Sequence, residues 1–177
     1  HYMFCNFVCL NCRIIIKINR TKLGKMLQLN LPSYDFKIKK VNEIHYIFDR
    51  QRRKYVKLTP EEWVRQHFIR FLLEEKHFPS AYLAVEKELI FNGMKKRCDA
   101  VLYNEKAQPQ MILEFKAPHV QLTQSVFDQV AVYNYQLNVE YFIVSNGIEH
   151  YCCRVKKANS KFEFLNEIPD YVDFLNQ

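Results

Sequence analysis

Several features that would mark other classes of protein are missing from this sequence. No G-x-x-x-x-G-K-[ST] phosphate-binding loop occurs, which argues against an ATP-driven motor in this chain. No apolar run reaches the length of about 20 residues that a membrane span needs, because polar residues such as Asn6 and Arg13 interrupt it. No secretion signal is evident, and Cys98, Cys152 and Cys153 lack disulfide or zinc spacing. These absences predict a protein of the reducing cytoplasm with no membrane partner.

Length and composition are those of one globular domain. The chain has 177 residues, of which 49% are hydrophobic, so it can bury a real core. Its net charge of +7 suggests a nucleic-acid partner, but five Lys or Arg and no acid fall within residues 1–25, leaving 21 basic and 19 acidic residues in the remainder. Three local basic stretches are either solvated faces or phosphate-contacting surfaces, and the sequence leaves both readings open. They are Lys37, Lys39 and Lys40; residues 50–54; and residues 95–97.

The first 25 residues look foreign to the rest of the chain. Met26 opens a continuous domain-like stretch, so we expect residues 1–25 to be an upstream translation product or cloning remnant and residues 26–177 to form the domain. Cys5, Cys9 and Cys12 have the spacing of the iron–sulphur motif in radical SAM enzymes, and thiolates so spaced can hold a cluster. The Asn before Cys12 and the lack of a barrel-length domain argue against that alternative.

Hydrophobic periodicity and turn residues predict an α/β domain with a central mixed sheet flanked by helices. Residues 44–58 are typical of a small hairpin. Thr59 followed by Pro60 predicts a helix start, and the helix should run to about residue 76. The remaining expected elements give the core order αβββαβ with two further strands. They are strands near 82–91, 97–103 and 110–116, a helix over 123–138, and strands near 141–145, 149–156 and 161–165.

Three charged residues stand in the two most strand-like segments. Side chains alternate along a strand, so Glu114 and Lys116 should share one face, and Asp99 can join them if the strands pair as a hairpin around residues 104–108. Two carboxylates can hold a hard cation such as Mg²⁺, and an ammonium can orient a water or steady negative charge. The structural alternative is a solvated Glu/Lys pair beside a surface Asp. The apolar neighbours Ile112 and Phe115 argue against full solvation.

Five segments in order resemble the N-terminal nuclease domain of type I restriction enzyme R (HsdR) subunits, within the PD-(D/E)xK nuclease superfamily. The resemblance implies a single restriction-endonuclease-like domain that cleaves DNA with Mg²⁺, for which Mn²⁺ can substitute. Asp99 and Glu114 would then ligate the metal and Lys116 would position the attacking water. DNA and other restriction-modification subunits would be partners. Cys98 stands where the superfamily name has Pro, a departure that does not touch the ligands. The segments are residues 59–66, 97–102, 113–118, 129–133 and 145–147.

Three further residues allow two interpretations each. Glu62 matches the family's first-helix acid, a third metal ligand, but it also completes a capping box with Thr59. Gln129 and Tyr133 lie four apart, on one helix face, and resemble the QxxxY motif that supports the site and contacts DNA. They could equally be a core tyrosine and its polar neighbour. The sequence thus predicts a metal-dependent endodeoxyribonuclease, with a catalytically silent DNA-binding or assembly module of the same fold as the alternative.

Overall fold

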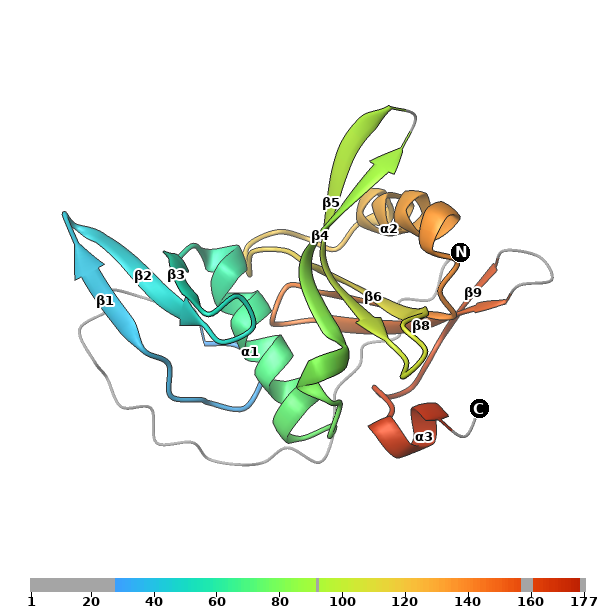
Figure 1. Cartoon of the computed structure of the whole chain (residues 1–177), viewed down its shortest axis with the longest axis horizontal. Helices are drawn as coiled ribbons and strands as arrows, with labels where there is room; N and C mark the ends of the chain where they lie inside the picture. The colour runs from blue at the N-terminus through green and yellow to red at the C-terminus, as the bar shows by residue number, and fades with distance from the viewer. Residues whose placement is uncertain (1–27, 92, 157–160, 176–177) are drawn as a thin grey trace.

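A computed structural model describes residues 28–91, 93–156 and 161–175 of this chain. These residues form one antiparallel sheet, one mixed sheet and three α-helices (Figure 1). The predicted tail over residues 1–25, with Cys5, Cys9 and Cys12, lies outside the described residues. Within the described part, no helix combines the length and apolarity that crossing a membrane would require. In chain order the α-helices and strands are β1 (Ile38–Val41), β2 (Ile44–Asp49), β3 (Lys54–Lys57), α1 (Pro60–Glu74), β4 (Leu83–Phe91), β5 (Met94–Tyr103), β6 (Pro109–Phe115), α2 (Gln124–Leu137), β7 (Tyr141–Ser145), β8 (His150–Lys156), β9 (Lys161–Phe164) and α3 (Tyr171–Leu175).

The main sheet has six strands in the order β4-β5-β6-β7-β8-β9. Its neighbours pair antiparallel except β6 and β7, which run parallel because α2 connects them as a crossover. The order α1-β4-β5-β6-α2-β7 is the αβββαβ core expected from the sequence, so the α/β prediction with a mixed central sheet is confirmed.

Alternation along β6 explains how one sheet supports two cores. Leu113 and Phe115 point to the side of α1, where they pack with Phe68. Ile112 points to the opposite side, where it packs in a cluster with Val130 of α2. Each of these residues is completely buried, as a strand covered on both faces requires. The two helices therefore cover opposite faces of the sheet.

Both helices begin and end close to the predicted positions, for local chemical reasons. Thr59 is the N-cap of α1, and its hydroxyl accepts a hydrogen bond from the Glu62 N–H at 3.1 Å. Helix α2 ends at Leu137 and is capped by Asn138, whose left-handed backbone conformation (φ 47°) and N–H bond to the Asn134 carbonyl close the last turn. Helix α1 ends at Glu74, two residues before the position that the sequence predicted.

Strands β1, β2 and β3 form a separate three-stranded sheet. The sequence predicted the β2–β3 hairpin, but it gave no separate sheet and no β1. Ile47 in the middle strand is completely buried, and Asp49 at its end is 1% exposed. Figure 1 shows this small sheet beside α1, on the side away from β9. It lies outside the αβββαβ core order.

The Asn146-Gly147 turn after β7 is packed against the start of the described chain. Gly147 has φ +83°, and a Cβ there would lie 2.7 Å from the Leu29 side chain and 3.0 Å from that of Val64. The Asn30 N–H donates to the Gly147 carbonyl at 2.7 Å. Glycine is therefore required both by the left-handed backbone and by the close approach of its neighbours.

Candidate functional site

Asp99 lies where strands β5 and β6 separate. The last paired residues before it are Ala100 and Leu113. One carboxylate oxygen of Asp99 accepts a hydrogen bond from the Phe115 N–H at 2.7 Å, which takes the place of the next ladder bond. The pairing fixes Asp99 on the same face of the sheet as Glu114, as the sequence predicted. That face is the one that α2 covers.

The other neighbour of β5 is also irregular at this point. Pairing between β4 and β5 runs through Val85 with Ala100 and resumes at Lys87 with Cys98, so Glu86 opposite Asp99 is unpaired. Glu86 has φ 56°, a left-handed conformation that is uncommon for a residue with a Cβ. Asp99 is thereby freed from regular pairing on both sides, and its side chain is held by the Phe115 bond instead.

Glu114 is a buried carboxylate with one satisfied and one unsatisfied oxygen. Only 2% of the residue is exposed. Its Oε1 accepts bonds from Lys116 Nζ at 2.8 Å and from Gln129 Nε2 at 2.7 Å. Its Oε2 is buried and has no hydrogen-bond partner among the described residues. An orphaned buried carboxylate oxygen is unfavourable unless a proton or a cation supplies the missing contact.

The two carboxylates repel each other, and burial makes their charged forms less favourable. Burial raises the pKa of Asp99 to about 7, and the nearby charge of Glu114 adds to the rise. Burial also raises the pKa of Glu114, against the lowering effect of the hydrogen bond from Lys116. Burial alone would lower the pKa of Lys116, but its bond to Glu114 and the charge of Asp99 raise it overall, so Lys116 is an ammonium. The cluster favours an added positive charge.

Helix α2 supplies the polar residues that hold this cluster in place. Gln129 donates from Nε2 to Glu114 and to the Tyr133 hydroxyl at 2.7 Å, and its Oε1 accepts from Lys116 at 3.2 Å. The Tyr133 hydroxyl in turn donates to the Arg97 carbonyl of β5 at 3.1 Å. The structure therefore brings five of the predicted site residues together: Asp99, Glu114, Lys116, Gln129 and Tyr133. The ring of Tyr133 is packed in the core, whereas its hydroxyl takes part in the hydrogen bonds of the cluster.

Glu62 lies in a different cluster from the one predicted. Its Oε2 accepts a hydrogen bond from Arg52 Nη2 at 3.2 Å, and Gln66 Nε2 donates to its Oε1 at 2.8 Å. The Arg65 guanidinium pairs with both of these oxygens. Arginines already pair with its carboxylate, and no contact joins it to Asp99 or Glu114 among the described residues, so its role as a third metal ligand stays a prediction. Its backbone N–H does bond Thr59, which is one half of the expected capping box.

Glu61, the other acid in the first turn of α1, is the one whose charge reaches the cluster, and sequence reasoning did not single it out. Its side chain is exposed, and its negative charge raises the pKa values of Asp99, Glu114 and Lys116. Neighbouring residues on a helix point about 100° apart, so Glu61 and Glu62 face different parts of the molecule. The capping-box rule selects the third helical position and passes over Glu61. The arginine partners that hold Glu62 were not visible in the local sequence.

The donor set fits a hard divalent cation. Within the described residues, no three His, Cys, Asp or Glu side chains come together as a metal-binding group. Asp99 and the free Oε2 of Glu114 would be the protein ligands, and Mg²⁺ is commonly held by only one or two carboxylates, with waters and substrate phosphates completing its shell. The orphaned oxygen is the observation on which this fit rests.

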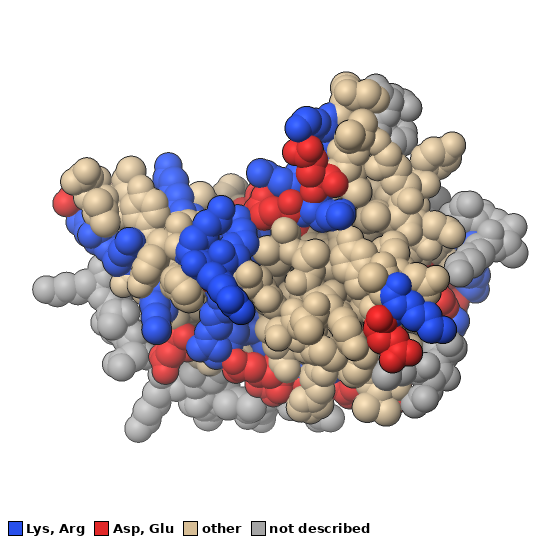
Figure 2. Space-filling model, in the orientation of Figure 1, with Lys and Arg blue, Asp and Glu red and all other residues tan. Residues whose placement is uncertain are grey.

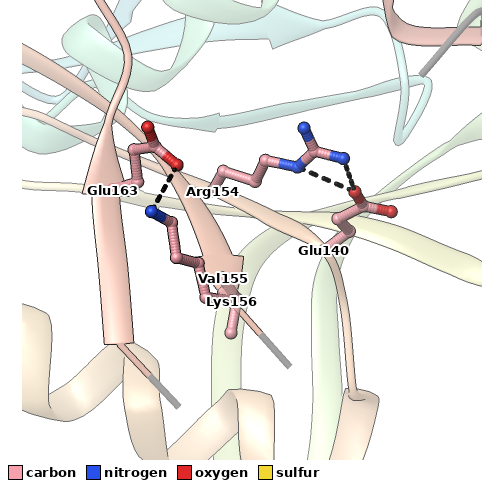
Figure 3. Close-up of a pocket in the computed structure, with 5 residues that line it drawn as sticks. All are labelled: Glu140, Arg154, Val155, Lys156 and Glu163. Atoms are coloured by element: carbon pink, nitrogen blue, oxygen red, sulfur yellow. Dashed lines mark hydrogen bonds and ion pairs between the residues drawn. The ribbon is translucent and has the colours of Figure 1, made fainter. Parts of the chain in front are cut away.

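A hollow on the far edge of the main sheet has no comparable feature. It is lined by Glu140, Arg154, Val155, Lys156 and Glu163, between β7, β8 and β9 (Figure 3). Arg154 pairs with Glu140 at 2.6 Å and Lys156 with Glu163 at 3.1 Å, so its four charges neutralise one another in pairs. Each of its charged side chains therefore already has a partner of opposite charge.

Comparison with known proteins places the chain in a family. A search of curated proteins gave no match. A solved fragment assigned to the HsdR subunit of a type I restriction enzyme from Vibrio vulnificus YJ016 is similar, with a TM-score of 0.47 and 16% sequence identity over 67% of this chain. This chain spans only a quarter (25%) of that structure's length. Residues 60–169 match the family described as type I restriction enzyme R protein N terminus, and the chain belongs to that family.

Proposed function

We propose that this domain is a metal-dependent endodeoxyribonuclease that hydrolyses phosphodiester bonds with Mg²⁺, or with Mn²⁺ in its place. The observation that carries the proposal is the free, buried Oε2 of Glu114 beside Asp99. A purely structural cluster would satisfy that oxygen, since an unpaired buried polar atom is destabilising. A divalent cation, when bound there, would polarise a phosphate and lower the pKa of a water molecule.

Each protein group has a defined part in such a reaction. Asp99 and Glu114 would hold the cation, and Glu61 would add negative charge at the mouth of the site. Lys116, kept as an ammonium, would donate a hydrogen bond to the attacking water and steady the negative charge that develops on the phosphate. Gln129 would fix the orientation of Glu114 and Lys116, since it bonds both side chains.

Membership of the R protein family also supports partners for the domain. We propose DNA as its substrate and other restriction-modification subunits as its partners. Cytoplasmic conditions would keep Cys98, Cys152 and Cys153 as the free, buried thiols that the structure describes.

Incubation of supercoiled plasmid with the purified protein and Mg²⁺ or Mn²⁺ tests the proposal. We expect nicked and linear products with the wild type, and loss of most of this activity with Lys116→Ala. Lys106→Ala is the matched control, because Lys106 is an exposed lysine in the β5–β6 turn, away from the cluster. Wild-type protein that binds DNA but never cuts it, even beside its partner subunits, would support the silent-module alternative.

A further inference from the structure

The positive charge of the described chain is concentrated in the three-stranded sheet. Residues 37–57 contain eight Lys or Arg and two acids, whereas the rest of residues 26–177 contains 13 Lys or Arg and 17 acids. The small sheet is therefore basic on a domain that is otherwise acidic. On the face drawn in Figure 2, blue side chains gather over the left part, where β1–β3 and α1 lie in Figure 1.

Three lysines of this sheet share one face. Strand register places Lys39 and Lys57 on either side of Tyr46 in one cross-strand row. Because side chains alternate, Lys37 shares this face, and the opposite face carries the completely buried Ile47. Lys37, Lys39 and Lys57 are all exposed. We call these three residues the lysine face.

The lysine face is free of acidic partners within the described residues. The nearby exposed cations Lys40 and Arg50 pair with Glu43 and Glu74, but no ion pair involves a member of the lysine face. The Lys39 ammonium instead lies 4.1 Å from the centre of the Tyr55 ring, and that of Lys37 lies 6.0 Å from the Phe48 ring. Aromatic rings position these ammonium groups without neutralising them.

One buried and two half-buried ion pairs fix this sheet beside the Asp99–Glu114 cluster. Asp49 at the end of β2 pairs with Arg65 of α1 at 2.7 Å. Arg52 in the β2–β3 turn reaches Glu62 of α1 at 3.2 Å and Glu86 of β4, opposite Asp99, at 3.4 Å. Strand β3 ends at Lys57, and α1, which carries Glu61, begins three residues later. The basic sheet is thus held in a set position next to the site.

We propose that the lysine face binds the phosphate backbone of duplex DNA and guides it to the Asp99–Glu114 site. Uncompensated lysines in fixed positions match the charge of a phosphate backbone, and such contacts are independent of base sequence. Lys37 and Lys39 lie over the rings of Phe48 and Tyr55, so ammonium groups occupy the ring faces on which bases of a single strand would stack. This inference rests on the proposed function only in taking DNA as the ligand.

Fluorescence anisotropy with a labelled duplex in EDTA tests the lysine face without cleavage. Wild type, the double variant Lys39→Ala with Lys57→Ala, and a control with Lys106→Ala and Lys156→Ala are titrated over a range of salt concentrations. The lysine-face variant should bind more weakly than the control, although both lose two charges. Its plot of log affinity against log salt should flatten by about 1.8, since each phosphate contact contributes about 0.9.

A second variant, Lys39→Arg with Lys57→Arg, keeps the charge and should keep the affinity and the salt slope, which separates lost contacts from lost folding. Equal binding by the lysine-face variant and the control overturns the inference. So does wild-type protein that fails to bind duplex, or that prefers a single strand of the same length. Protein that binds duplex through these lysines yet never cuts it refutes the nuclease proposal alone, because the assay contains no metal.

Discussion

Replacing Asp99 with Asn should stabilise the metal-free protein while it weakens metal binding. The carboxylate is half-buried beside Glu114, and the two charges repel each other in the absence of a cation. Asparagine has nearly the same shape and retains an oxygen that can accept the bond from the Phe115 N–H, which Asp99 now accepts at 2.7 Å. The change therefore removes the charge and leaves the local backbone supported.

The size of the effect follows from the pKa of about 7, compared with 3.8 for an ordinary aspartate. At pH 8 the carboxyl is charged in both the folded and the unfolded protein, so its full unfavourable effect on folding is present. Each pH unit of difference corresponds to about 1.4 kcal/mol, which gives an upper bound of about 4 kcal/mol. Solvent reaches this partly exposed group, so we expect about 1–2 kcal/mol, or about 2–8 °C in melting temperature.

The pH dependence of stability gives a second test of whether the Asp99 charge is unfavourable for folding. As the pH falls through 7, the folded protein takes up a proton on Asp99 that the unfolded chain takes up only near 3.8, so this carboxyl contributes a rise in wild-type stability toward pH 6. Asp99→Asn should lack this rise. Thermal melts in EDTA at pH 6 and pH 8, then with Mg²⁺ at pH 8, measure both effects. Asp128→Asn, an exposed carboxyl on α2, is the control. A lower melting temperature for Asp99→Asn at pH 8, or equal stabilisation of both proteins by Mg²⁺, would refute the reasoning.

Three other variants test the remaining contacts. Lys116→Ala should keep or improve Mn²⁺ affinity in calorimetric titration, because a repelling cation leaves and both carboxylates stay; a large loss would contradict the assigned roles. Gln129→Leu should lower cleavage by about 10–100-fold with the fold intact, since Glu114 and Lys116 lose their orienting bonds; unchanged rates would exclude Gln129 from the site. Arg65→Met should lower the free energy of unfolding in urea by about 1–3 kcal/mol, because Asp49 and Glu62 each lose one arginine partner while Arg52 still pairs with both, whereas Arg50→Ala at an exposed pair should have little effect.

Most of the fold was predictable because its signals are local. Thr59 and Pro60 start α1 through capping chemistry that needs no distant partner, and the alternation around Glu114 follows from strand geometry alone. The separate sheet and its first strand were not predictable. Strand β1 is mostly exposed, so it shows little hydrophobic pattern, and it is fixed by pairing with β2. Such tertiary pairing leaves no local mark.

The site was predictable to the extent that it lies on regular strands. Alternation placed Glu114 and Lys116 on one face, and a hairpin brought Asp99 to them. The choice between Glu61 and Glu62 could not be made from spacing, because it depends on Arg52, which lies ten residues upstream in another sheet. The lack of a hydrogen-bond partner for Oε2 of Glu114 could not be predicted either, because it depends on which side chains pack around that atom in the folded structure.

The break in strand pairing at Glu86 divides the β4–β5 ribbon into two parts of unequal stability. On one side, Ala100 and Leu102 are buried in the core. On the other, residues 94–97 are exposed, so few apolar contacts oppose the opening of that segment. Local opening of the outer ribbon can therefore occur without unfolding the sheet beneath it. Asp99 lies at this boundary, so we expect the amide hydrogens of residues 94–97 to exchange faster than those of the core, while the Asp99 carboxylate stays bonded to the Phe115 N–H.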